Sequence, residues 1–460
     1  MLRSHSYRQH GVTLVELMIA MVLGMLVAAG IVTVFVSTSN NNRAQTQLAR
    51  LQEEGRFAIT RLGSDLRMAD GQYCTNTGGI AQPVASGLYL DHLRAPKVYA
   101  KHLIGTATGT SSGAFGDVTT VWGGTSGSVN YPAVPAATYS MPSFLFMRGY
   151  DCTLTTCTPV DPTIAGLPAM GTAVGDRVKG TDVITVRYVD SSRGWAIGDA
   201  GGSSIGTASD GSGISSITLN PGTGEPPRSN FTNGDLVMLA DCSSAQIFAA
   251  SYSVASGLLT MSVDDNFDDS HPMMPRLESA PKVFDVNRDF QTVTYYLKVV
   301  SINNDGKPPL TGALIRRVNG GLKPDGTGTQ SGAFEDELVR GIERMDFRYG
   351  VEDVDGNTRF LTAQQIDTST NCPPAETNAI TTAGCLWRGI KSIEVSVLMD
   401  GQMPLYSLGM SELGYSYGID NMTKLAAPAS HPIKPGDQGF IDQMLRREFT
   451  ALVAVRNYNP

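Results

Sequence analysis

The 460-residue chain lacks the patterns that enzymes and nucleic-acid-binding proteins need. Its net charge is -8 and no stretch forms a basic stripe, which argues against a nucleic-acid partner. The six histidines are scattered and no Cys-x-x-Cys pair occurs, so we expect no zinc site. Neither a P-loop nor a dinucleotide-binding fingerprint is present. We therefore expect no cofactor and no enzymatic activity.

Two weaker patterns are interpreted as loops. A Gly-x-Ser-x-Gly sequence at 109–113 lies in a Gly/Ser/Thr-rich tract without a clear strand before it, unlike the nucleophile elbow of a hydrolase. Asp353 and Asp355 are weak calcium candidates, but the segment lacks the distal glutamate of an EF-hand loop and suits a hairpin turn. We expect no bound metal.

Charge is also missing from residues 17–36, whereas residues 1–11 contain Arg3 and Arg8 and no acid. Twenty helical residues span about 30 Å, the thickness of the hydrocarbon core of a membrane. The basic side should stay in the cytoplasm, so the rest of the chain should lie outside the inner membrane. Such a segment fits a secretory signal peptide, a plain anchor or a prepilin leader, and the small residues at 27–29 suit signal peptidase.

Glu16 separates these alternatives. A carboxylate in an apolar membrane segment costs about 2.5–3.5 kcal/mol near the centre and less near an end, so it is by default functional. The sequence at 11–17, GVTLVEL, resembles the prepilin peptidase motif of the type IV pilin superfamily. The resemblance implies cleavage between Gly11 and Val12, N-methylation of Val12, and a Glu16 that pairs with the freed amine of a neighbouring subunit and so fixes its register.

One long helix should follow the leader. No proline occurs before Pro83. Apolar residues recur at steps of three and four and form a stripe: Ala44, Leu48, Leu51, Gly55, Ala58, Leu62, Leu66 and Ala69. The sequence therefore predicts a helix over 12–69 that stops at Asp70 and Gly71. Its apolar half carries a face of small residues that would let helices approach closely: Ala20, Gly24 and Ala28.

The remainder predicts β-structure. Segments rich in β-branched and aromatic residues lie at 183–189, 235–240, 292–300, 313–318, 345–349, 393–399 and 449–455. Apolar residues alternate with others in the last two segments, which predicts an antiparallel sheet with one solvent-exposed face. Gly/Ser/Thr-rich stretches at 105–128, 200–216 and 319–333 are predicted to be loops. The fold class is thus α+β, a long N-terminal helix packed on a large, mainly antiparallel β body.

The six cysteines predict disulfides, because the body should lie in an oxidising compartment. Cys152 and Cys157 would close a small loop, and Cys372 and Cys385 a larger one. Cys74, just after the helix, would then pair with Cys242 at the end of a strand.

Further segments narrow the family. The stem sequences at 51–58 and 65–69, the strand end at 234–242, Tyr295 and Tyr296, the segments 341–343 and 347–351, and the C-terminal 446–457 resemble PilW-type minor pilins. The resemblance implies a leader (1–11), a membrane and fibre-core helix (12–36), its amphipathic continuation (37–70) and a periplasmic or extracellular body (71–460).

It also implies a minor pilin that helps to start type IV pilus assembly, at or near the tip, as part of a minor-pilin complex. Its partners would be other minor pilins, the major pilin, prepilin peptidase, the inner-membrane assembly platform and a tip adhesin. Two alternatives are a type II secretion pseudopilin of the tip complex and a tip adhesin that binds a surface ligand.

Overall fold

The computed structural model describes residues 11–456 with gaps. The gaps are 75–79, 85–86, 92–94, 102, 104–124, 127–128, 131–132, 134, 199–201, 232, 262–266, 268–270, 320–334, 353–356, 369–383 and 407.

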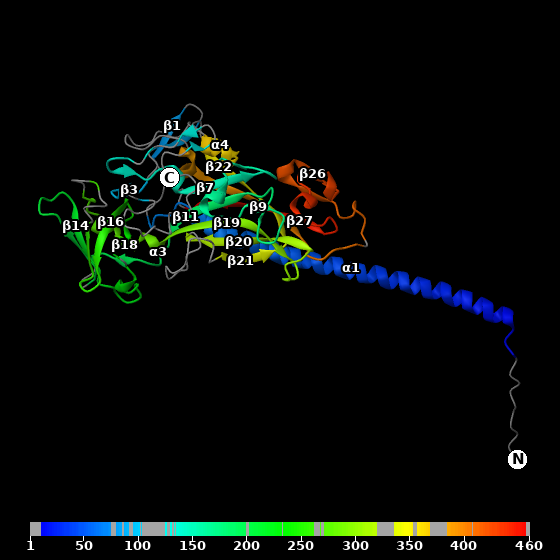
Figure 1. Ribbon diagram of the computed structural model, residues 1–460. Helices are drawn as coiled ribbons and strands as arrows, with labels where there is room; N and C mark the ends of the chain where they lie inside the picture. Colours follow the sequence, from blue (N-terminus) through cyan, green and yellow to red (C-terminus); the bar gives the residue numbers. More distant parts are fainter. Residues whose placement is uncertain are drawn as a thin grey trace, which may run out of the picture.

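A single helix, α1 (Leu14–Met68), forms the stem of the molecule (Figure 1). Its 55 residues correspond to a length of about 80 Å. It begins two residues later than predicted because Thr13 acts as its N-cap in an extended conformation. It ends at Met68 with Ala69 as its C-cap, and Asp70 follows in a left-handed turn with φ 63°.

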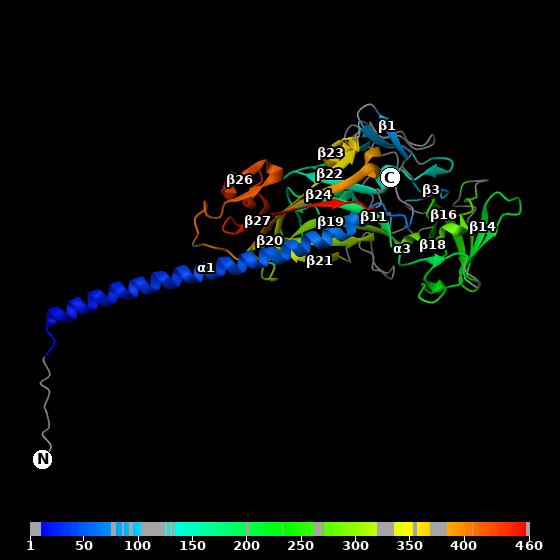
Figure 2. The same ribbon diagram turned by 180° about the vertical axis from the view of Figure 1, so that it is seen from behind.

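The two halves of α1 have different surroundings. Every large apolar side chain from Val12 to Val36 is at least half exposed, and this half projects freely from the body (Figures 1 and 2). The second half buries the predicted stripe of Leu51, Gly55, Ala58, Leu62 and Leu66. The prediction of a buried stripe was wrong at Leu48, which is 38% exposed. The body contacts the neighbouring Gln47 instead, whose Nε2 donates to the carbonyl of Met403 at 3.0 Å.

A four-stranded antiparallel sheet supports the stem. Its order is β23 (Thr358–Leu361), β22 (Ile342–Glu352), β24 (Ile390–Asp400) and β27 (Arg446–Ala454). The stem packs on β27 and β24 and also contacts β21 and β11 of the next sheet. Its buried leucines join residues of both sheets, such as Val293, Phe347 and Val395, in one large core.

An eight-stranded sheet forms the middle of the body. Its main path is β21 (Glu335–Arg340), β20 (Leu310–Val318), β19 (Phe290–Ser301), β11 (Val183–Val189), β7 (Met147–Cys152) and β8 (Cys157–Thr158). Two short strands flank it, β9 (Met170–Gly171) and β10 (Arg177–Val178). Among the strands that the structure describes, all pair antiparallel except β9 with β10 and β3 with β16.

A nine-stranded sheet lies at the end of the body farthest from the free half of the stem (Figures 1 and 2). Its main path is β12 (Trp195–Ala196), β18 (Lys282–Asp285), β15 (Leu236–Ala240), β16 (Ala245–Ser253), β17 (Leu258–Met261), β14 (Ile214–Thr218) and β13 (Ser204–Thr207). The strands β3 (Lys97–Val98) and β6 (Tyr139–Ser140) pair beside it. It has a core of its own around Trp195, Phe231 and Phe248. We call residues 195–285 the distal lobe.

The remaining elements are short. Two-stranded sheets are formed by β1 (Ile80–Val84) with β2 (Gly87–Asp91), by β4 (Thr125–Ser126) with β5 (Val129–Asn130), and by β25 (Tyr415–Tyr417) with β26 (Met422–Ala426). Short helices are α3 (Val286–Asp289) and α4 (Ala363–Thr368).

All seven predicted strands are present, but two other predictions were wrong. The stretch 200–216 is not only loop, because β13 and the start of β14 form a hairpin there. The solvent-exposed face predicted for 393–399 is instead covered, because Leu398 packs against Tyr415 and Tyr417. The alternation holds at β27, where Val453 is buried and Leu452 is 63% exposed. Most of 105–128 and 319–333 lies outside the described residues.

Two glycines of α1 should respond differently to alanine. A Cβ added at Gly63 would meet Val453 Cγ2 at 3.7 Å, an ordinary contact, so Gly63→Ala should gain about 1 kcal/mol of helix propensity. A Cβ at Gly55 would lie 2.6 Å from the ring of Phe449. Overpacking costs about 1–3 kcal/mol, so Gly55→Ala should be neutral or destabilising. Thermal unfolding of both variants checks this, and equal stabilisation would contradict the close packing of β27 on the stem.

Candidate assembly site

The start of the stem places Glu16 in the first helical turn. The Glu16 backbone N–H donates to Thr13 Oγ1 at 3.3 Å, and Glu16 Oε2 accepts from the Thr13 backbone N–H at 3.0 Å and from its hydroxyl at 2.9 Å. This capping box holds the carboxylate at the positive end of the helix dipole. Sequence reasoning missed it, although Thr-x-x-Glu before an apolar run is its usual signature.

The other predicted residues of this region lie along an exposed helix. Gly11 and Val12 precede the N-cap in non-helical conformation, and Val12 is 72% exposed. Ala20, Gly24 and Ala28 are exposed, and a Cβ added at Gly24 would meet no atom within 4 Å. Cleavage, methylation and helix packing therefore stay predictions for these positions. The structure leaves the segment open to the solvent or to a partner.

A buried carboxylate fastens the stem to the body. Asp65 is 6% exposed and accepts from Tyr188 Oη at 3.0 Å, Tyr295 Oη at 2.6 Å and Arg316 Nε at 2.7 Å. These three partners lie on the adjacent strands β11, β19 and β20. Burial raises the pKa of Tyr188 and of Tyr295 above their usual range, and the charge of Asp65 adds to the shift, so both remain donors.

A second buried pair closes the C-terminal part of the body. Arg446 and Glu343 are 5% and 1% exposed and meet in a bidentate pair, with Nε–Oε2 at 2.6 Å and Nη2–Oε1 at 2.8 Å. The guanidinium also donates to the carbonyls of Ile441, Asp442 and Met444. Burial raises the pKa of Glu343 to about 7, the charge of Arg446 opposes this shift, and Asp400 adds to it.

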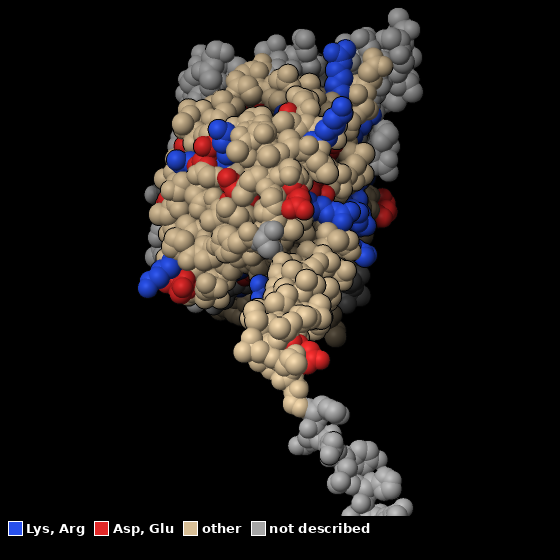
Figure 3. Space-filling view, turned by 90° about the vertical axis from the view of Figure 1, so that its right-hand side faces the viewer, with Lys and Arg blue, Asp and Glu red and all other residues tan. Residues whose placement is uncertain are grey.

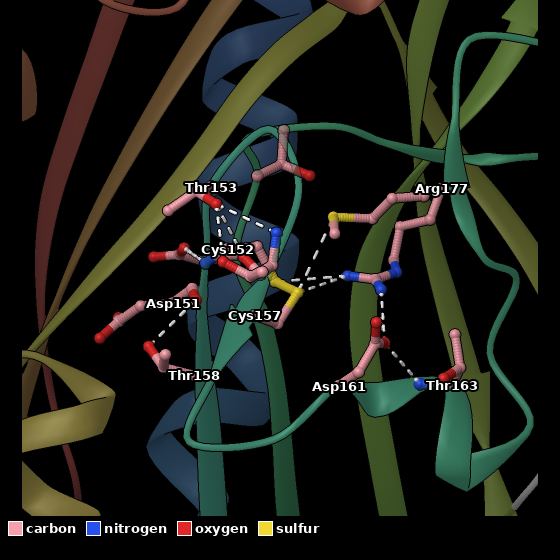
Figure 4. The surroundings of a disulfide bond; sticks show 12 residues. Asp151, Cys152, Thr153, Cys157, Thr158, Asp161, Thr163 and Arg177 are labelled. Carbon is pink, nitrogen blue, oxygen red and sulfur yellow. Dashed lines mark hydrogen bonds and ion pairs between the residues drawn. A yellow bond between two sulfur atoms is a disulfide. The ribbon is translucent and has the colours of Figure 1, made fainter. Parts of the chain in front are cut away.

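Two disulfides are formed among the described cysteines. Cys74 bonds to Cys242 and joins the end of the stem to the distal lobe, with Cα atoms 4.6 Å apart. Cys152 bonds to Cys157 across the β7–β8 hairpin, and Arg177 Nη1 lies 3.3 Å from both sulfurs (Figure 4). Asp161 accepts from the other end of that guanidinium at 3.0 Å. These are two of the three pairings that the sequence predicts.

The remaining candidates fall largely outside the described residues. Cys372, Asp353 and Asp355 lie in gaps, and the side chain of Cys385 is not described, so the third disulfide stays a prediction. Within the part of the chain that the structure describes, no group of three or more His, Cys, Asp or Glu side chains could hold a metal ion. No chemistry beyond packing, pairing and cross-linking is evident at the residues described above.

The fold and the stem together define a class. A helix with a free, apolar N-terminal half, long enough to cross a membrane, packs by its other half on an antiparallel body. With Glu16 at its head, this arrangement defines a type IV pilin-like subunit. The helix and the leader motif indicate membrane anchoring followed by incorporation into a pilus.

Comparisons with known protein families agree with this class. Residues 294–457 match the family model of the type IV pilus-assembly protein W (PilW), and residues 6–32 match the prokaryotic N-terminal methylation motif. These two matches, over residues 294–457 and 6–32, support a PilW-type minor pilin involved in type IV pilus assembly. Proteins of this family are typically structural, and the matches imply pilin partners and processing by prepilin peptidase. Searches among curated proteins and among solved structures found no match.

The family match does not cover the whole body. It begins within β19 and includes the four-stranded sheet, whereas the distal lobe precedes it in the chain. The residues that fasten stem to body are divided in the same way, because Tyr295 and Arg316 lie inside the match and Asp65 and Tyr188 outside it.

Proposed function

We propose that this minor pilin helps to start the fibre and occupies its tip. Residues 1–11 are a cytoplasmic leader, 12–36 cross the inner membrane, 37–70 continue the stem, and 71–460 form a periplasmic body that later reaches the cell surface. The chain acts structurally, not as a catalyst. The observation that carries the proposal is the free apolar half of α1 headed by the exposed Glu16.

Glu16 would set the register of docking. In the single subunit its carboxylate is held by Thr13. Cleavage after Gly11 creates an ammonium group on a neighbouring subunit, and an ion pair in an apolar helix bundle is strengthened by the low dielectric. Other minor pilins, and then the major pilin, would join through the same contact at the assembly platform.

The distal lobe supports a place at the tip. It lies at the end of the body opposite the free half of the stem (Figure 1). In a fibre whose core is made of stems, a lobe at that end would occupy the space of the next subunit above. The last position of the fibre is free of this conflict. The family match names pilus assembly, which favours a pilus over the type II secretion alternative.

Cleavage between Gly11 and Val12 is the first prediction. The cut lies at the cytoplasmic end of the apolar run and leaves α1 whole from Leu14 to Met68. Mass spectrometry of the mature protein should find an N-methylated Val12, and Gly11→Leu should leave the leader attached. A mature chain that begins at Gly30 would mean cleavage by signal peptidase and would contradict the proposal.

Glu16→Leu should abolish capture by partner pilins while anchoring and cleavage survive. Loss of the carboxylate leaves the neighbour's ammonium unpaired in an apolar core. The measurements are co-purification of partner pilins, the number of surface fibres, and labelling of fibres by an antibody against the distal lobe. Glu53→Leu is the matched control, since Glu53 is an exposed acid in the amphipathic half of the same helix.

Wild-type cells and the Glu53→Leu control should show partner pilins, fibres and label at fibre ends. If the Glu16 side chain only reaches toward the membrane surface, Glu16→Leu removes the free-energy cost of a carboxylate in the membrane. Partner pilins should then co-purify as they do with wild type. That result would refute the pairing mechanism. Label along the whole shaft would refute the position at the tip.

A further inference from the structure

One loop of the body extends along the stem toward its membrane half. Residues 401–406 and 408–411 connect β24 to the residues before β25, and in Figures 1 and 2 this loop reaches further along α1 than the rest of the body. We call it the stem loop. Its start is fixed to the stem, because Gln47 Nε2 donates to the Met403 carbonyl at 3.0 Å and Arg50 Nη2 donates to Gln402 Oε1 at 3.1 Å.

The position of this loop relative to a membrane follows from the burial of α1. The apolar run ends at Val36, and the next charge is Arg43. Ser39 and Asn40 are already partly buried, as is Ala44, whereas residues up to Thr38 are exposed. Ser39 lies three residues beyond Val36, which is about 4.5 Å along a helix. The headgroup layer on one side of a bilayer is about 5–8 Å thick, so the body first covers the stem within that layer.

The composition of the stem loop suits this layer. No charged residue occurs from 401 to 411. Tyr406 is 76% exposed, Met403 48% and Met410 39%. Seen along the stem, most of the surface around it is uncharged (Figure 3). Exposed tyrosine with its apolar ring and polar hydroxyl is typical of the membrane–water interface.

We propose that the stem loop rests in the headgroup layer of the phospholipid membrane that holds α1, with Tyr406 inserted beside the stem. This inference depends on membrane insertion of 12–36, the anchor of the proposed function. The loop is the part of the body that reaches furthest along α1 toward its lipid-facing half (Figures 1 and 2). The contact would hold the body upright on the bilayer before extraction and would be released when the stem enters the fibre.

Tryptophan quenching by brominated phospholipids tests the depth of the loop. The full-length protein is reconstituted in vesicles of phosphatidylcholine and phosphatidylglycerol brominated either near the headgroup or deep in the acyl chain. Tyr406→Trp reports on the loop, Leu26→Trp on the middle of the apolar run, and Leu425→Trp is the matched control. Leu425 is 75% exposed, similar to Tyr406, but lies on β26, away from the stem (Figure 1). The signal of the unsubstituted chain, with three native tryptophans, is subtracted.

The expected result is a loss of Tyr406→Trp fluorescence that is greater with bromine near the headgroup than deep in the chain. Leu26→Trp should show the opposite order, and Leu425→Trp should lose no fluorescence with either lipid. If Leu26→Trp is quenched while Tyr406→Trp matches Leu425→Trp, the loop faces water or a neighbouring pilin and the inference fails alone. If Leu26→Trp is not quenched either, the membrane anchor fails together with the inference.

Discussion

Arg446→Met should lower the free energy of unfolding by about 3–5 kcal/mol, because it removes one partner of a fully buried ion pair. The substitution leaves Glu343 without its bidentate partner and three carbonyls, those of Ile441, Asp442 and Met444, without their donor. Urea unfolding of the purified, disulfide-intact protein in detergent measures the loss. The affected region is the four-stranded sheet, where Glu343 lies on β22 and Arg446 on β27.

The pH dependence follows from the raised pKa of Glu343, about 7 in the folded chain against an ordinary 4.5. Between these values the folded chain keeps a proton that the unfolded chain has lost. The contribution of this group to stability is therefore fully present below about pH 4.5 and is lost as the pH rises through about 7. Asp289, whose pKa burial raises to about 6, has the same sign.

Substitutions of the two partners should therefore have opposite pH dependences of stability relative to wild type. Without the charge of Arg446 the pKa of Glu343 rises further, so Arg446→Met should cost more at pH 8 than at pH 5. Glu343→Gln is the matched control, because it mimics the protonated acid and removes this titration. Its stability relative to wild type should improve from pH 5 to pH 8. Parallel profiles for all three proteins would refute a protonated Glu343 near neutral pH.

Asp65→Ala should also destabilise the protein by about 3–5 kcal/mol, and its effect should be concentrated where the stem meets the body. The change leaves the Arg316 guanidinium, 11% exposed, without its carboxylate and the Tyr295 hydroxyl without its acceptor. The Tyr188 hydroxyl keeps only the longer of its two hydrogen bonds, the one to Gln291 Oε1 at 3.5 Å. Because three adjacent strands hold this one side chain, its loss should also loosen α1. Urea unfolding and limited proteolysis of the stem give the two measurements.

Two further variants separate charge from geometry. Asp65→Asn keeps an acceptor for a tyrosine but loses the charge, so its cost should be smaller than that of Asp65→Ala. Ser64→Ala changes the exposed neighbour on the same helix and should stay within about 0.5 kcal/mol of wild type. Equal costs for Asp65→Ala and Ser64→Ala would show that the stem is held by apolar packing alone.

Features that depend on neighbouring residues in the chain could be predicted before the structure was known. The uninterrupted apolar run and the apolar stripe after it predicted α1 to within two residues at each end. Alternation and β-branched residues predicted seven strands, because local periodicity reflects which face is buried. Glu16 was identified because a carboxylate within an apolar run has a free-energy cost in a membrane, and such a residue is visible in the local sequence.

Contacts between residues that are distant in the chain could be seen only in the folded protein. Asp65 and Tyr295, or Glu343 and Arg446, are 230 and 103 positions apart, and no local pattern reveals that their side chains face each other. The same reason explains why Gln47 and not Leu48 contacts the body, since its partner Met403 is remote in the chain. It also explains why Leu398 is buried, since Tyr415 and Tyr417 of another strand cover it. The contact of the stem loop with Gln47 could likewise not be predicted from the sequence, because Met403 lies 356 residues further along the chain.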